Sequence, residues 1–212
     1  MSQVFVDFFA RTHLMTRLLI TVACPAIISR DAWFANEPLG PANKFESPPP
    51  MVIFHHSGKL PCNTTDSCIV RMIELQRLHQ RDRHWFDFGY NFAVGGDGSV
   101  YEGRGWDKES AVAKNYNDKS INIVFLGNFS ATAPSSEIMT TAKNLIDCGV
   151  RMGKISPDYK LVGYQEGGPE RPADGNGSGK SLFSLIQSWP HWSSINITAQ
   201  PPTEVKLALL IE

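Results

Sequence analysis

The sequence predicts a mixed α/β domain, in which a central mixed sheet of about five strands is flanked by three helices. Short apolar runs rich in β-branched residues alternate with longer segments whose apolar residues recur at helical spacing. A glycine-rich tetrapeptide, Gly95–Gly98, separates two of the short runs in the manner of a hairpin turn. The predicted order is therefore β-α-β-β-β-α-β-α, and 212 residues suit one such domain with additional ends.

The predicted strands are the short apolar runs. Met51–His56 is continuously apolar up to its two histidines, which is typical of a buried strand. Ile121–Leu126 alternates poorly between apolar and polar residues, so we expect it near the centre of the sheet. The other three strands are predicted at residues 90–94, 99–103 and 160–164.

Capping residues and helical spacing predict the three helices. The first is expected to follow Thr65 and Asp66, which are good N-cap residues, and to end near residues 82–84. The second opens at Pro134–Glu137. The third contains Leu182, Leu185, Ile186 and Trp189 and is stopped by Pro190. A loop rich in glycine and proline at residues 165–180 precedes it.

The two ends of the chain carry weaker signals. Residues 1–23 end in a short apolar run that cannot span a bilayer. A weak signal peptide and the truncated stub of a membrane anchor both remain open for this segment. The domain itself is expected at residues 24–192, and the tail at 193–212 has no clear partner.

Charge and cysteine usage limit the function classes. The formal net charge is −1, which excludes a broad basic field for nucleic acid. None of the four cysteines lies in a CxxC pair, so the spacing of a cysteine zinc site is absent. Two disulfides are favoured over free buried thiols, because other features indicate an oxidising compartment. Four N-glycosylation sequons, at Asn63, Asn128, Asn176 and Asn196, support an oxidising, extracellular compartment.

Long ordered motifs resemble one known family. Trp85–Phe92 resembles a W-x-D-I-G-Y-N-F segment, and Gly95–Trp106 is similar to a GGDG-x-VYEGRGW run almost letter for letter. Met51–His56 is similar to a strand that carries a His-His pair. Further segments in family order are Cys24–Arg30, Tyr116-Asn117, Leu126–Phe129 and Trp189–Trp192. Over residues 24–192 the chain therefore resembles the peptidoglycan-recognition proteins, which share the type 2 zinc amidase fold, and most of all their insect members.

This resemblance implies a zinc site that has lost two of its three protein ligands. The family includes amidases that cut between N-acetylmuramic acid and L-alanine, together with receptors and regulators that do not cut. Its first zinc-ligand position holds His55 and its assisting tyrosine position holds Tyr90, but the second ligand position holds Tyr164. The third ligand is a cysteine, and no cysteine follows Cys148. We therefore expect no enzyme activity and no metal or other cofactor, with His55, Tyr90 and Tyr164 vestigial. Metal binding by His56 and His79 in another geometry stays open.

The resemblance also implies binding residues and disulfides. The candidates for binding peptidoglycan fragments are His55, Tyr90, Arg104, Trp106, Tyr116 and Asn117, although Arg104 and Trp106 are equally explained as structural residues. Asp118 stands where binders of diaminopimelic acid carry an arginine, and Val112 replaces an imidazole. The implied disulfides are Cys62–Cys68 and Cys24–Cys148.

The expected function is non-catalytic recognition of bacterial muropeptides in innate immunity, by a secreted protein or an ectodomain. The alternative is a regulatory domain with little glycan affinity that acts through other recognition proteins. Of the three functions, the residues support a zinc-dependent amidase least.

Overall fold

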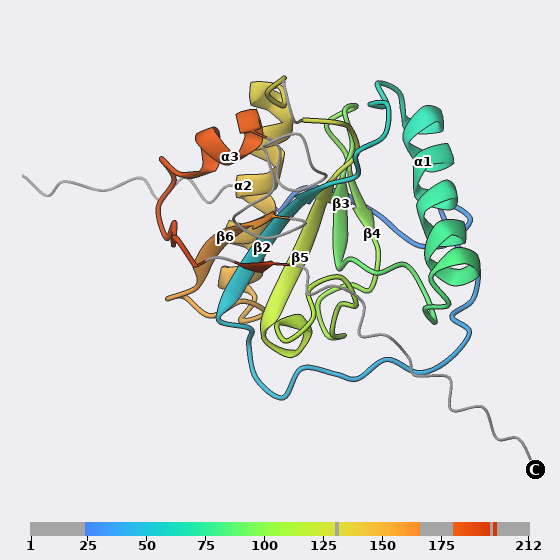
Figure 1. Ribbon diagram of the computed structural model, residues 1–212, viewed down its shortest axis with the longest axis horizontal. Helices are drawn as coiled ribbons and strands as arrows, with labels where there is room; N and C mark the ends of the chain where they lie inside the picture. Colours follow the sequence, from blue (N-terminus) through green and yellow to red (C-terminus); the bar gives the residue numbers. More distant parts are fainter. Residues whose placement is uncertain (1–23, 130–131, 166–179, 196, 199–212) are drawn as a thin grey trace, which may run out of the picture.

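The computed structural model describes residues 24–129, 132–165, 180–195 and 197–198. A seven-stranded sheet crosses the centre of the protein, with α1 on one face and α2 and α3 on the other (Figure 1). The strands lie in the order β1-β4-β3-β5-β2-β6-β7, and every neighbouring pair is parallel except β3 and β4. Their bounds are β1 Ile27–Ile28, β2 Met51–His56, β3 Phe92–Val94, β4 Val100–Glu102, β5 Ser120–Phe125, β6 Lys160–Gln165 and β7 Ile197–Thr198. The mixed α/β class is confirmed.

The two central strands account for the strongest sequence signals. β2 and β5 pair in parallel over six residues each, and every residue of both strands is buried. Helices cover both faces of the sheet here, so neither face selects polar side chains and alternation is lost. The expectation that Ile121–Leu126 is central is confirmed.

The predicted helices exist, with shifted ends. α1 spans Thr65–Arg77 and continues as a π-helical turn, η1, at Leu78–Asp82. Its N-cap is Thr64, one residue before the predicted cap, because Thr64 and Ser67 form a reciprocal capping box. α2 spans Ser136–Arg151 and is capped by Ser135. α3 spans Lys180–Ile186 and ends earlier than predicted, since Trp189 lies in the following turn.

Two apolar layers hold these elements together. On one face, β2 and β5 contribute Phe54 and Ile123, which pack with Leu145 of α2. On the other face, Val124 of β5 packs with Met72 of α1. Two disulfides add covalent links: Cys24–Cys148 joins the segment before β1 to α2, and Cys62–Cys68 closes the start of α1. Both disulfides expected from the resemblance are therefore present.

The β3–β4 hairpin shows why its turn is rich in glycine. A Cβ at Gly96 would lie 2.0 Å from the backbone oxygen of Cys62, so only glycine permits this approach. Gly98 has a φ of 78°, in the left-handed region. Asp97 between them accepts hydrogen bonds from Thr65 and Tyr101. The predicted hairpin is confirmed, and its turn is fastened to the first turn of α1.

The sheet is wider than predicted at both edges. β1 and β7 have two residues each, which is too short for any periodicity in the sequence. The expectation that the tail has no partner was wrong, because Ile197 pairs in parallel with Tyr164 of β6. The segments 1–23 and 199–212, with most of the loop at 165–180, lie outside the described residues.

None of the helices described here combines the length and the apolar character needed to cross a bilayer.

Candidate functional site

A cluster of three rings forms where β2 and β6 run side by side. His55 on β2 follows Phe54, which pairs with Gly163, so Tyr164 is its neighbour on β6. The ring centroids of His55 and Tyr164 are 4.6 Å apart, and those of His55 and Tyr90 are 5.1 Å apart. His55 is only 3% exposed. The structure thus brings together His55, Tyr90 and Tyr164, with both phenol rings in contact with the imidazole.

A chain of hydrogen bonds leads from His55 to the loop before β5. The Nε2 atom of His55 lies 2.7 Å from Oδ1 of Asn122. The side-chain amide of Asn122 donates to Ser110 at 2.8 Å, and the Ser110 hydroxyl donates to Oδ1 of Asn117 at 2.8 Å. The structure therefore connects His55 with Asn117 through two residues that sequence reasoning missed. One signal for Asn122 existed, since it is the polar residue within the otherwise apolar run Ile121–Leu126.

The surroundings of His55 fix its protonation. The Asn122 amide nitrogen also donates to the Ser120 hydroxyl, so the Asn122 oxygen faces the imidazole and Nε2 donates its hydrogen. Burial lowers the pKa of His55 to about 3, while the bond to Asn122 opposes that shift and the nearby His56 adds to it. His55 is consequently a neutral hydrogen-bond donor at physiological pH.

This donor set does not fit a catalytic zinc ion. Such an ion needs three protein ligands with available lone pairs and an open position for water. His55 donates its Nε2–H to Asn122 and keeps the lone pair of Nδ1, so it can serve as one ligand. The phenol of Tyr164 at the second position is a poor ligand, with a reference pKa of about 10. Within the described ranges, no three His, Cys, Asp or Glu residues gather closely enough to hold a metal. The loop at 166–179 contains neither histidine nor cysteine.

The other two candidate histidines do not converge. His56 lies on the α2 face, where its Nδ1 atom accepts from the backbone of Phe129 at 3.4 Å. His79 lies in η1 on the α1 face, where its Nδ1 atom accepts from the backbone of Gly89 at 3.0 Å. The sheet separates them, which removes the alternative metal geometry.

The remaining candidates are divided between the site and the scaffold. Tyr116 packs in the same apolar cluster as Tyr164, and Asn117 belongs to the polar chain, so both border the ring cluster. Arg104 instead donates to the backbone oxygens of Phe88 and Glu109, which holds its guanidinium inside the scaffold.

Trp106 lies away from the ring cluster. Its ring packs 4.3 Å from that of Phe92, on the face covered by α2. A Cβ at Gly149 of α2 would come within 2.7 Å of the indole. The structure therefore packs the half-buried Trp106 against the core, as the structural explanation of this residue expects.

Comparison with known proteins assigns this fold to a family. Residues 45–177 match the protein family described as N-acetylmuramoyl-L-alanine amidase. Peptidoglycan-recognition protein LB of Drosophila melanogaster is 41% identical over 179 residues, which cover 84% of this chain and 74% of that protein. The chain belongs to the peptidoglycan-recognition protein family.

Solved structures of other peptidoglycan-recognition proteins have the same fold. The structure of Drosophila PGRP-LB superimposes with a TM-score of 0.73 and covers 81% of this chain and 98% of that one. The structure of PGRP-LE in complex with tracheal cytotoxin, a monomeric diaminopimelic acid-type peptidoglycan, gives a TM-score of 0.73 at 32% identity, covering 80% of this chain and 97% of that one.

The family alone does not decide between binding and hydrolysis. The N-acetylmuramoyl-L-alanine amidase of Mus musculus is 34% identical over 177 residues, which cover 82% of this chain but 32% of the mouse protein. Relatives named as enzymes and relatives named for recognition therefore resemble this chain to a similar degree. The decision depends on the chemistry of the site residues.

Proposed function

We propose that this peptidoglycan-recognition protein binds bacterial muropeptides without hydrolysing them and acts in innate immunity by modulating antibacterial signalling. The observation that carries the proposal is the phenol ring of Tyr164 beside His55. It occupies the neighbouring position where a second strong zinc ligand would be needed. No zinc and no other cofactor takes part.

Relatives support the ligand and the partners in this proposal. PGRP-LE has been solved in complex with tracheal cytotoxin, and the same molecule has been solved bound to the ectodomain complex of PGRP-LCa and PGRP-LCx. Peptidoglycan fragments and other recognition proteins are accordingly the proposed partners. The proposed contact residues of this chain are Tyr116 and Asn117. The buried side chains of His55, Tyr90 and Tyr164 form the base of the proposed binding site.

The proposed setting is extracellular, as a secreted protein or as the ectodomain of an anchored form. Two disulfides support it, because such bonds persist in oxidising compartments. Residues 24–192 form the recognition domain in this proposal, with 1–23 as a leader or anchor remnant and 193–212 as a tail.

Binding is tested by retention on insoluble peptidoglycan. We expect the wild-type chain to be retained and Tyr116→Ala to be retained about tenfold less, since the ring supplies contact area at the border of the site. Tyr159→Ala is the matched control, because Tyr159 is an equally half-buried tyrosine that stacks on His191 beside α2. We expect this control to be retained like the wild type.

The alternative is a regulatory domain with little glycan affinity, and the near-complete burial of His55, in contact with Tyr164, favours it. It predicts that insoluble peptidoglycan does not retain the wild-type chain, under conditions in which it retains PGRP-LE. That outcome would replace the binding proposal with partner recognition.

Hydrolysis is expected to be absent at every zinc concentration. With the phenol of Tyr164 in place of a second strong ligand beside His55, the site lacks the ligand set for a zinc ion that would lower the pKa of a bound water towards ~7. Release of stem peptides from muropeptides is measured with added zinc and with a chelator, and the mouse amidase serves as the positive control. Zinc-dependent release by this chain, or stoichiometric zinc in the purified protein, would contradict the proposal.

A further inference from the structure

Two of the four sequons have their asparagine in the described part of the chain, at Asn63 and Asn128, and both side chains are exposed. Asn176 and Asn196 lie outside the described residues. A sequon is only a sequence pattern, so whether it is used has to be argued from the structure around it. The surroundings of Asn63 favour its modification.

The fold gives the side chain of Asn63 no structural role. Asn63 directly precedes the N-cap of α1, where an asparagine commonly serves a cap or a turn. Here Thr64 and Ser67 form the capping box between themselves. Asn63 contributes only its backbone N–H, which donates to the Ser67 hydroxyl at 3.2 Å. Its side-chain amide makes no hydrogen bond to any described residue, so neither a cap nor a turn explains an asparagine here.

The neighbours of Asn63 hold its backbone at the surface. Cys62 belongs to a disulfide, and its backbone oxygen lies close against Gly96 of the β3–β4 turn. Thr65, the third residue of the sequon, donates its hydroxyl hydrogen to Asp97 in the same turn. A group attached to Nδ2 of Asn63 therefore displaces no hydrogen bond of the folded chain and extends into solvent.

Asn63 and the proposed muropeptide contacts lie at opposite ends of the sheet (Figure 1). Asn117 lies in the turn that leads into β5, whereas Asn63 lies beyond the end of β2. β2 and β5 run in parallel over six paired residues, which separates their two ends by about 17 Å. A bulky group on Asn63 therefore leaves Tyr116 and Asn117 accessible.

We propose that Asn63 carries an N-linked glycan. In the transfer, C1 of the first sugar leaves a phosphate oxygen of a lipid-linked glycosyl diphosphate and bonds to Nδ2 of Asn63. Nδ2 gives up one proton to solvent, and the lipid diphosphate is the leaving group. The modification rests on the extracellular setting proposed above, because the donor is met on the secretory route.

The transfer precedes the folding of this segment. In the folded chain Thr65 is the first residue of α1, its hydroxyl is bonded to Asp97, and the Cys62–Cys68 disulfide closes the segment around the sequon. An enzyme that reads the Asn63 amide and the Thr65 hydroxyl together needs both of them unbonded. The glycan is consequently expected on protein that was secreted by a cell, and folded protein cannot acquire it afterwards.

The test uses the full chain, secreted by cultured insect cells behind a heterologous signal peptide. Peptide N-glycosidase in heavy-oxygen water converts a glycosylated asparagine to a heavy-labelled aspartate. After reduction, trypsin releases the peptide Leu60–Arg71, in which Asn63 is the only asparagine. Mass spectrometry is expected to find the label in this peptide, and the intact protein is expected to lose the mass of its glycan.

Three variants and one matched control define the site. Asn63→Gln and Thr65→Val each destroy the sequon and are expected to lose one glycan, the second with Asn63 still in place. Thr65→Ser keeps a sequon hydroxyl and is expected to keep the glycan. Asn128→Gln makes the same substitution at the other exposed sequon, and its Leu60–Arg71 peptide is expected to stay labelled.

Two results would overturn the proposal. One is an unlabelled Leu60–Arg71 peptide from the secreted wild-type chain, and the other is a label that persists in Thr65→Val, because spontaneous deamidation of Asn63 would then explain it. Retention on insoluble peptidoglycan is measured on the same material. An absent glycan with intact retention contradicts only this proposal, and a present glycan without retention contradicts only the muropeptide proposal.

Discussion

The free energy of unfolding is expected to fall steeply as the pH is lowered from about 6.5 to about 4. Two histidines cause this, because each is buried in its neutral form. Burial lowers the pKa of His55 to about 3. Burial also lowers the pKa of His79 to about 3, with the positive charges of Arg83 and Arg104 adding to the shift.

The sign of the effect follows from proton binding. Between pH 3 and 6.5, the unfolded chain binds a proton at each of these histidines and the folded chain does not. Their contribution is therefore complete above pH 6.5 and is lost as the pH falls towards 3. Each histidine contributes a slope of about 1.4 kcal/mol per pH unit, so the pair contributes about 2.7. His56 acts in the same direction, since burial lowers its pKa as well.

Urea unfolding at a series of pH values measures this slope. His79→Asn keeps an acceptor near the backbone N–H of Gly89 but cannot be protonated, so it is expected to remove about half of the slope. The control is His84→Asn, an exposed position with a φ of 56° that asparagine tolerates. A stability that stays constant from pH 6.5 to 4 would mean that the two imidazoles are hydrated in the folded protein.

The central part of the fold was predictable because strong local signals agreed with the tertiary structure. β2 and β5 are buried on both faces, so their apolar runs carried the information in the sequence itself. The capping residues of α1 and α2 act within one turn, and the predicted helix starts were correct to within two residues. The edge strands β1 and β7 depend on pairing with distant segments, which no short pattern encodes.

The site was predictable in its residue types and less so in its geometry. Motif positions identified His55, Tyr90 and Tyr164, and the structure brings their rings together. Motif positions cannot show which face of the sheet a side chain joins, and so Trp106 was grouped with residues on the opposite face. The bond between His55 and Asn122 joins residues 67 positions apart, and only the pairing of β2 with β5 creates it.

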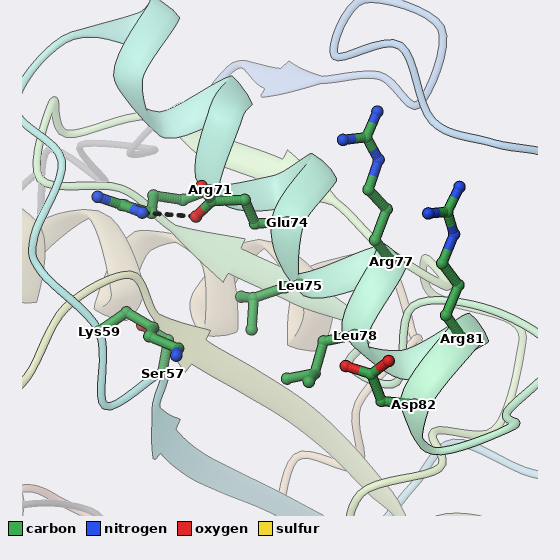
Figure 2. A pocket seen from close by; sticks show the side chains of 9 residues that line it. All are labelled: Ser57, Lys59, Arg71, Glu74, Leu75, Arg77, Leu78, Arg81 and Asp82. Atoms are coloured by element: carbon green, nitrogen blue, oxygen red, sulfur yellow. Dashed lines mark hydrogen bonds and ion pairs between the residues drawn. The ribbon is translucent and has the colours of Figure 1, made fainter.

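The hollow between α1, η1 and the loop that follows β2, drawn in Figure 2, shows the same limit of sequence-based prediction. Arg77 and Arg81 alone have the spacing of an ordinary solvated helix face. They line a cavity because the loop after β2 brings Lys59 to the same place as Leu75 and Leu78. A concave surface formed by two separate segments cannot be predicted from the sequence of either segment alone.

Removal of the Cys24–Cys148 disulfide is expected to destabilise the protein about twice as much as removal of Cys62–Cys68. The first bond joins residues 124 positions apart and the second joins residues 6 apart. A long closed loop restricts the unfolded chain far more than a short one. The chain-entropy relation therefore gives losses of about 5 and about 2 kcal/mol at 25 °C. The comparison uses Cys24→Ala/Cys148→Ala and Cys62→Ala/Cys68→Ala, each measured by urea unfolding under oxidising conditions.

The two double variants control for each other in packing. Cys62 and Cys68 are both buried, whereas Cys24 is exposed and only Cys148 of the first pair is buried. Truncation to alanine therefore removes more buried sulfur in the Cys62/Cys68 variant than in the Cys24/Cys148 variant. Lost packing alone would thus make the Cys62/Cys68 variant the less stable one, which is the opposite of the order expected from loop closure. A larger loss for the long loop cannot then be a packing effect. Equal losses would instead mean that the unfolded chain keeps its first segment close to α2 without the bond, so that closing the loop restricts little.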